Sequence, residues 1–77
     1  MDENYFLRRR FADGREETET MSMEDAYHRM PQVMTEELIA RHKGKAPNVI
    51  YLCRGVRIGG EETIMEECDL KPKEESK

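Results

Sequence analysis

Residues 47–70 of this 77-residue chain read PNVIYLCRGVRIGGEETIMEECDL and form its densest run of apolar and β-branched residues. Such residues fit a pleated, half-buried surface, so the run predicts β-strands. The pair Gly59-Gly60 interrupts the run and marks a turn. The stretch therefore predicts an antiparallel hairpin around which a small core is built.

The register of this hairpin is predicted from the pairing that best separates apolar from polar side chains, because a one-residue slip moves every side chain to the opposite face. A three-residue loop, Gly59-Gly60-Glu61, separates them best. A bulge at Gly55 is an alternative that would change the phase of the residues after it. A four-residue loop is the second alternative, and it would bring Cys53 opposite Cys68, where a disulfide is conceivable. The favoured register pairs Ile50 with Leu70, Leu52 with Cys68, Arg54 with Glu66 and Val56 with Ile64.

A second hairpin is predicted near the start of the chain, where YFLRRRFA (residues 5–12) is followed by Asp13-Gly14 and then by REETETM. Asp-Gly is a preferred pair for a two-residue type I′ turn. The competing interpretation is one long strand that runs into an irregular acidic loop, because residues 16–20 are not strong strand formers as a set. The hairpin would put Arg10 opposite Glu17, Arg8 opposite Glu19 and Phe6 opposite Met21, with Tyr5, Leu7 and Phe11 on the inner face.

The segment between the hairpins carries two helix signals. Ser22 suits a helix N-cap, and Pro31 limits that first helix, because the residue before a proline is pushed out of the α region. Thr35 is a second N-cap candidate, with Gly44 at the C′ position of the same helix. The inward residues predicted for the two helices are Met23, Ala26, Tyr27 and Met30 in the first and Leu38 and Ile39 in the second.

These elements predict an α+β fold: a small four-stranded antiparallel sheet made of two hairpins, with one or two short helices packed on one face. Residues 1–70 are expected to form a single domain, and residues 71–77 (KPKEESK) a disordered tail without apolar residues. A chain of this length is near the lower limit for one hydrophobic core. Association into a homodimer is therefore expected.

The composition indicates a small core under a crowded, charged surface. Hydrophobic residues make up 36% of the chain and charged residues 39%, with 13 Lys and Arg against 17 Asp and Glu, giving a net charge of -4. An acidic balance argues weakly against a dedicated nucleic-acid-binding protein. The chain has no apolar run near the ~20 residues of a membrane helix, and it begins without a basic signal region. We therefore expect a cytoplasmic protein that does not contact the membrane.

The chain contains residue types that bind metal ions or act as nucleophiles, but they lack the sequence spacing that such sites usually have. His28, His42, Cys53 and Cys68 are zinc-binding types, but no two of them stand at the short spacing that places two ligands on one element. A nucleophilic cysteine would also require an orienting group and a cleft, for which so short a chain has little material. We expect reduced thiols that serve as small core residues, no metal, no cofactor and no enzymatic activity.

The surface predicts a binding role. Rows of carboxylates steer association with basic partners, and methionine-rich surfaces adapt to a partner's shape. We therefore expect a non-enzymatic interaction protein that binds a larger macromolecule, a protein with a basic surface. Small acidic accessory proteins of phages and mobile elements, including inhibitors of host nucleases or defence complexes, share this size and character. The predicted partner-binding residues are Glu16, Glu17, Glu19, Met30, Met34, Tyr51, Glu66 and Glu67.

The alternative function is a small RNA- or DNA-binding regulator. Basic residues at 8–10 and at 41–45 could contact phosphates, although those at 41–45 also suit the negative end of a helix. Ordinary solubilisation explains the acidic rows equally simply. The residues predicted for the nucleic-acid alternative are Arg8, Arg10, Arg41, Lys43 and Lys45.

Overall fold

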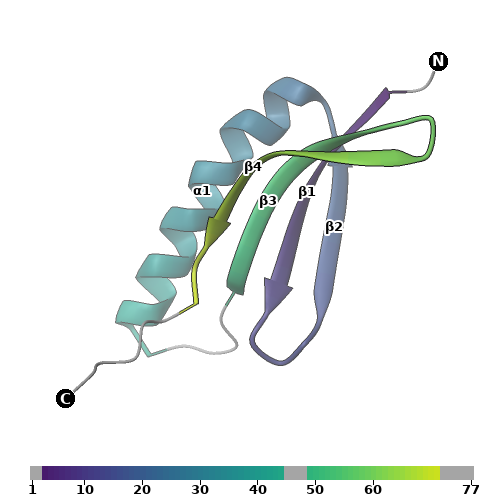
Figure 1. Ribbon diagram of the computed structural model, residues 1–77. Helices are drawn as coiled ribbons and strands as arrows, with labels where there is room; N and C mark the ends of the chain where they lie inside the picture. Colours follow the sequence, from purple (N-terminus) through teal and green to yellow (C-terminus); the bar gives the residue numbers. More distant parts are fainter. Residues whose placement is uncertain (1–2, 45–48, 72–77) are drawn as a thin grey trace.

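The computed structural model describes residues 3–44 and 49–71, and within them the chain forms four strands and one helix (Figure 1). The strands form one antiparallel sheet in the order β2-β1-β3-β4. The helix lies on one face of this sheet (Figure 1). The predicted α+β class and the four-stranded antiparallel sheet are thus confirmed. The elements are β1 (Glu3–Phe11), β2 (Glu16–Met21), α1 (Met23–His42), β3 (Val49–Ile58) and β4 (Glu61–Asp69).

The hydrophobic core lies between α1 and the two central strands. Leu7 of β1 is 1% exposed and Leu52 of β3 is fully buried, so the centre of the sheet is closed by the helix. Phe11 packs against this core, which confirms the predicted inner face of the first hairpin. The buried residues of the core cluster are Leu7, Met30, Val33, Val49, Leu52 and Leu70.

The helix is continuous through Pro31, where the sequence predicts an end. A proline inside a helix removes a hydrogen bond and costs about 3 kcal/mol. Met30 and Val33, on either side of Pro31, are each 2% exposed, and burying one such side chain contributes roughly 1.5–3 kcal/mol. Burial on both sides of the proline therefore outweighs its cost. Pro31 itself is exposed.

The two ends of α1 match the sequence prediction, but its middle does not. The Ser22 hydroxyl accepts a hydrogen bond from the Asp25 N–H at 3.0 Å, and Gly44 N–H donates to Arg41 O just past the last turn. Thr35 lies inside the helix instead of capping one. Leu38 and Ile39 were expected to point inward, but both are exposed, because the turn that faces the sheet carries Val33 and Glu37.

The first hairpin forms with a register one residue away from the predicted one: Arg10 pairs with Glu16 and Arg8 with Thr18. A type I′ turn needs positive φ at both central residues. Of Asp13 and Gly14, only Gly14 has it. The observed loop spans residues 12–14, and Phe11 N–H donates to Arg15 O at 2.8 Å. This is a type I turn followed by a glycine bulge, which shifts the whole pairing.

The second hairpin has the predicted register in its lower half only. Leu52 pairs with Cys68 and Arg54 with Glu66, as expected, but Gly55 pairs with Ile64, so Met65 is an extra residue in β4. The irregularity lies opposite Gly55, in β4, whereas β3 runs through Gly55 without a change of phase, so the bulge is not in the strand considered. The predicted pairing of Val56 with Ile64 is wrong. Both Gly59 and Gly60 have positive φ and form a two-residue loop instead of the predicted three-residue one.

Gly55 occupies a place where no side chain fits. It pairs with Phe6 across the strands, and the Phe6 ring lies over it. A Cβ at this position would collide with the Thr63 carbonyl oxygen and lie 2.8 Å from Cζ of Phe6. The glycine thus lets β4 bulge inward while the Phe6 ring covers the exposed backbone.

Replacing Gly55 with alanine is expected to lower the free energy of unfolding by about 1–3 kcal/mol, because the added methyl group overpacks this contact. Chemical denaturation followed by circular dichroism measures the change. As a control, Thr20→Ala on the exposed edge strand should change stability by less than about 0.5 kcal/mol. A Gly55→Ala protein as stable as the wild type would show that Phe6 does not pack closely here.

Candidate functional site

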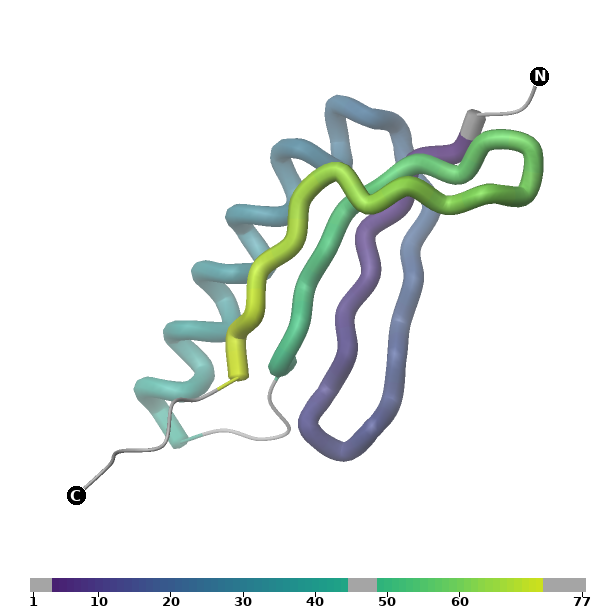
Figure 2. The backbone as a smooth tube through the Cα atoms, viewed as in Figure 1, coloured from purple at the N-terminus to yellow at the C-terminus, as the bar shows by residue number. Residues whose placement is uncertain are grey.

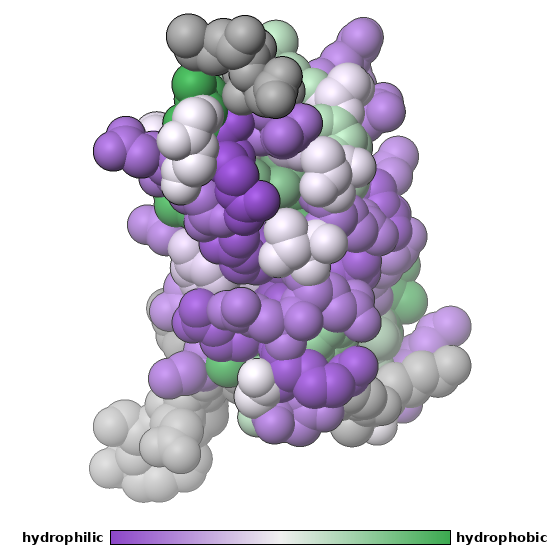
Figure 3. Space-filling model, turned by 90° about the vertical axis from the view of Figure 1, so that its right-hand side faces the viewer, coloured by the Kyte–Doolittle hydropathy of each residue, from purple (hydrophilic) through white to green (hydrophobic). Residues whose placement is uncertain are grey.

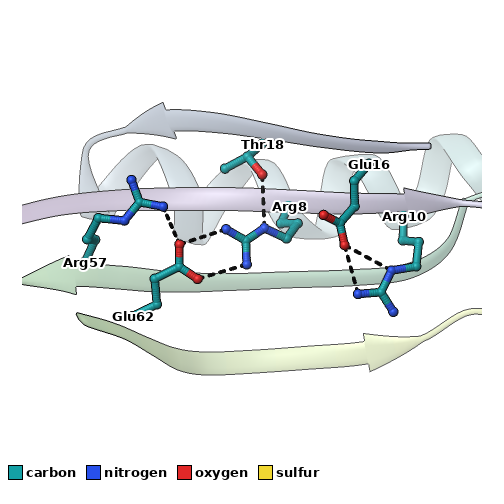
Figure 4. A network of polar contacts seen from close by, with 6 residues as sticks. All are labelled: Arg8, Arg10, Glu16, Thr18, Arg57 and Glu62. Atoms are coloured by element: carbon teal, nitrogen blue, oxygen red, sulfur yellow. Dashed lines mark hydrogen bonds and ion pairs between the residues drawn. The ribbon is translucent and has the colours of Figure 1, made fainter. Parts of the chain in front are cut away.

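The face of the sheet opposite α1 is covered by a network of charged side chains (Figure 4). Arg8 of β1 donates to both carboxylate oxygens of Glu62 on β4, at 3.1 and 2.9 Å, and its Nε donates to Thr18 Oγ1 on β2 at 3.0 Å. Arg57 of β3 also donates to Glu62. One guanidinium group therefore connects the two outer strands across the middle of the sheet.

This network covers apolar side chains on the face of the sheet that α1 does not cover. The Arg8 guanidinium lies 4.6 Å from the centre of the Phe6 ring, and Cys53 beside it is fully buried. Burial raises the pKa of the Cys53 thiol. Tyr51 donates a hydrogen bond to Glu67, which raises the pKa of its hydroxyl. The open face is therefore a closed polar surface and offers little to a ligand.

The predicted acidic residues of β2 lie on both faces of the sheet, Glu16 on the open face and Glu17 and Glu19 on the helix face, and the arginines of β1 neutralise them. Arg10 binds Glu16 at 2.9 Å, and Arg9 lies 3.7 Å from Glu17 and 3.3 Å from Glu19. The side of the molecule that carries β2 is mainly hydrophilic (Figure 3).

The remaining predicted partner-binding residues are separated by the sheet. Tyr51 and Glu67 meet on the open face, while Glu66 lies on the helix side, where Arg54 Nε donates to it at 2.8 Å. Met30 is a core residue and presents little surface to a partner. Met34 is partly buried against the core.

The basic residues of the nucleic-acid alternative are not brought together. Arg8 and Arg10 are paired with carboxylates on the open face, whereas Arg41 binds Glu37 at 2.7 Å inside the helix and also donates to Val49 O at 2.6 Å. Arg41 thus joins the end of α1 to the start of β3. Lys43 is exposed at the helix C-cap, and Lys45 lies outside the described residues.

An apolar hollow of about 410 Å³ lies on the other side of the sheet, between the first turns of α1 and the bulge of β4. Its main walls are Tyr27, which is 58% exposed, and Met65, which is 45% exposed. The Arg54 guanidinium stacks 5.3 Å from the Tyr27 ring centre. The lining residues are Met23, Glu24, Tyr27, Arg54 and Met65.

A second hollow of about 220 Å³ continues along the helix, with Tyr27 belonging to both. Its walls include Pro31 and Met34 of α1 and Glu66 of β4. The lining of this hollow places Glu66 of β4 next to the middle of α1, and among the described residues β4 is the last strand of the sheet on this side (Figure 2). We call the two hollows together the α1/β4 groove, lined mainly by Met23, Tyr27, Pro31, Met34, Met65 and Glu66.

The bulge builds this groove. With the unbulged register expected from the sequence, Met65 would sit opposite Gly55 and point to the open face. The extra residue instead turns Met65 to the helix side, next to Tyr27. Tyr27 was expected to point inward, yet it forms the groove wall. Three of the predicted partner-binding residues, Met30, Met34 and Glu66, line its second hollow, and the possible bulge at Gly55 was the sequence signal for the position of Met65.

In the part of the chain that the structure describes, the side chains form neither a metal-binding site nor a disulfide. No group of three His, Cys, Asp or Glu side chains there is placed to hold a metal ion. Cys53 and Cys68 are both free thiols, and they point to opposite faces of the sheet, since Cys53 pairs with Glu67 and Cys68 with Leu52. No disulfide joins them.

Within residues 3–44 and 49–71, no helix combines the length and the apolar character that crossing a lipid bilayer requires.

Comparison with known proteins identifies no relative: no protein family model, no curated protein and no solved structure matches this chain.

The Arg8–Glu62–Arg57 network predicts a pH-dependent stability. Hydrogen bonds from Arg8 and Arg57 lower the pKa of Glu62 from 4.5 to about 2. The folded protein therefore gains stability from this carboxylate above pH 4.5, and loses that gain as the pH falls toward 2. Glu62→Gln should be less stable than the wild type at neutral pH, with a difference that shrinks across this window.

Denaturation midpoints measured at a series of pH values test this expectation. Glu61→Gln is the matched control, because Glu61 lies in the same strand and has no ion-pair partner among the described residues. Its effect should vary little with pH. A Glu62→Gln deficit that stayed constant down to the lowest pH would contradict the role given to the carboxylate.

Proposed function

We propose that this protein is a non-enzymatic interaction protein that binds a larger protein partner through the α1/β4 groove. The observation that carries the proposal is the convergence of exposed apolar side chains from two elements, Met23 and Tyr27 of α1 and Met65 of β4, in one hollow. Exposed apolar patches rimmed by polar residues mark interaction sites. Tyrosine and methionine are also enriched in such interfaces.

The shape of the groove favours a chain segment over a compact ligand. It runs along α1 for about three turns, from Met23 through Tyr27 and Pro31 to Met34. One side is formed by a helix and the other by a strand. An elongated, open groove of this kind holds an extended or helical peptide, whereas small molecules are usually enclosed in deeper cavities.

The absence of enzymatic activity is supported by the positions of the reactive residues. The fully buried Cys53 lies on the open face, whereas His28 and His42 are carried by α1 on the opposite side of the sheet. Cys53 and the two imidazoles are separated by the sheet and cannot share a proton. Cys68 lies on the helix side, where it is partly buried against the hydrophobic core. Binding to a partner's surface is also the way in which an inhibitor acts, so the expected inhibitor role forms part of this proposal.

The nucleic-acid alternative gains no support from the fold. Phosphate contacts need available cationic groups, but Arg8, Arg10 and Arg41 are engaged with carboxylates inside the molecule. The function supported best is thus protein binding. The cytoplasmic location and the homodimer stay predictions.

Photo-crosslinking tests the groove directly. The photoreactive residue benzoylphenylalanine is placed at Tyr27, in cells that naturally make the protein, and the crosslinked protein and peptide are identified by mass spectrometry. We expect one discrete crosslinked partner from this position. The matched control is the same residue at Ile39, an equally exposed apolar position of α1 that lines neither hollow. Equal products from both positions, or none from Tyr27, would contradict the proposal.

The purified partner then allows a quantitative test. Met65→Glu should weaken binding by about tenfold or more, because it places a charge where an apolar contact is buried. Thermal stability should change little, since Met65 is exposed in the free protein. Wild-type affinity in the Met65→Glu protein would remove the groove from the binding site.

A further inference from the structure

The strand beside the groove has an unpaired edge. β4 is the last strand of the sheet, and β3 is its only neighbour among the described residues. Leu70 N–H donates to Ile50 O at 2.9 Å, and hydrogen-bonding direction alternates along an antiparallel strand. The main-chain groups of Glu67 and Asp69 therefore point away from β3. They are free to pair with another extended chain.

The two faces of β4 differ in chemistry next to this edge. On the helix side, Met65 and the groove offer apolar contacts. On the open face, Glu67 and Asp69 present carboxylates, as shown by their pairing with Cys53 and Tyr51. The strand as a whole, EETIMEECD, carries five carboxylates and no lysine or arginine.

These observations indicate which kind of strand could pair with the free edge of β4. A strand added to β4 sends alternate side chains to the helix side and to the open face. The residues on the helix side would meet the groove, where apolar side chains fit. Those on the open face would lie opposite Glu67 and Asp69, where lysine or arginine forms opposite-charge cross-strand pairs.

We propose that the groove's occupant is an extended segment of the partner protein, with apolar and basic residues in alternation, that adds to the sheet as a fifth strand beside β4. This inference rests on the proposed function and specifies the chemistry of the partner. The main chain supplies the pairing, while the alternation supplies the specificity.

A second copy of this chain is the less suitable occupant. Pairing β4 with the β4 of another copy joins two strands that each carry five carboxylates and no lysine or arginine, and such a pair lacks the opposite-charge pairs that stabilise a sheet. The other free edge, β2, carries Glu16, Glu17 and Glu19. Both edges thus repel each other, which is a common defence against edge-to-edge self-association. A homodimer would have to use another surface.

The experiment uses the full-length protein and short synthetic peptides. The test peptide alternates lysine with valine. One control peptide replaces each lysine with glutamate, and another keeps the composition but groups the lysines in one block. Titration calorimetry should detect binding of the alternating basic peptide only, with an affinity that falls as salt is added. No binding of this peptide, or equal binding of the block or acidic peptide, overturns the inference.

The decisive variant is made by chemical synthesis of the chain with an N-methyl group on the Glu67 amide. This change blocks an outward-facing N–H without touching the ladder to β3, so the fold is retained and peptide affinity should fall about tenfold or more. The matched control is N-methylation of Thr20 on the other edge strand, β2. Phe11 N–H donates to Arg15 O, and hydrogen-bonding direction alternates along β2, so the Thr20 amide points away from β1. The control should bind the peptide like the wild type.

Two outcomes separate the inference from the proposed function. If the N-methyl-Glu67 protein binds the peptide and the crosslinked partner as well as the wild type, the groove binds without strand addition and only the inference fails. If Tyr27 yields no crosslinked partner, the proposed function itself fails. Sedimentation of the protein alone provides the last test: self-association that N-methylation of Glu67 abolishes would identify the occupant as a second copy and overturn the inference.

Discussion

A single α-helix covers only part of a four-stranded sheet. A helix with its side chains is about 10–12 Å wide, whereas neighbouring strands lie about 4.8 Å apart, so α1 spans little more than two strands. It packs over β1 and β3, where Leu7 and Leu52 are buried. The helix side of β4 is consequently covered only at its end, near Cys68 and Leu70, and is left open around Met65. The α1/β4 groove is the direct result of this mismatch in width.

The same shortage of covering material shapes the opposite face. No helix lies there among the described residues, yet Phe6 and Cys53 are removed from water. Charged side chains with long aliphatic stems do the covering, as Arg8 does over the Phe6 ring. Each of these arginines must then be matched by a carboxylate, so the high content of both charges follows from the architecture. On this face, Glu16 of β2 and Glu62 of β4 therefore serve the fold first.

Much of the fold could be predicted from local sequence, because turns, caps and alternation are local signals. Both hairpins, the Ser22 and Gly44 ends of α1 and the Arg54–Glu66 pair are of this kind. The continuity of the helix through Pro31 could not be predicted in this way, because it depends on burial against strands that are distant in sequence. The bulge at Met65 is also a tertiary feature, set by the contact of Phe6 with Gly55. Met30, Met34 and Glu66 of the groove were among the predicted partner-binding residues, but the positions of Tyr27 and Met65 were missed, because a long-range contact overrides the local pattern there.

Tyr27 and Met65, the main walls of the larger hollow, belong to the surface and contribute little to the core. Tyr27 and Met65 remain about half exposed, while the side chains that hold the sheet together lie elsewhere. Substitutions at these two positions therefore put the fold at little risk. A lineage carrying this scaffold can exchange them freely, so that recognition diversifies while the architecture persists. The bulge is the exception, because a change at Gly55 would alter the direction of Met65.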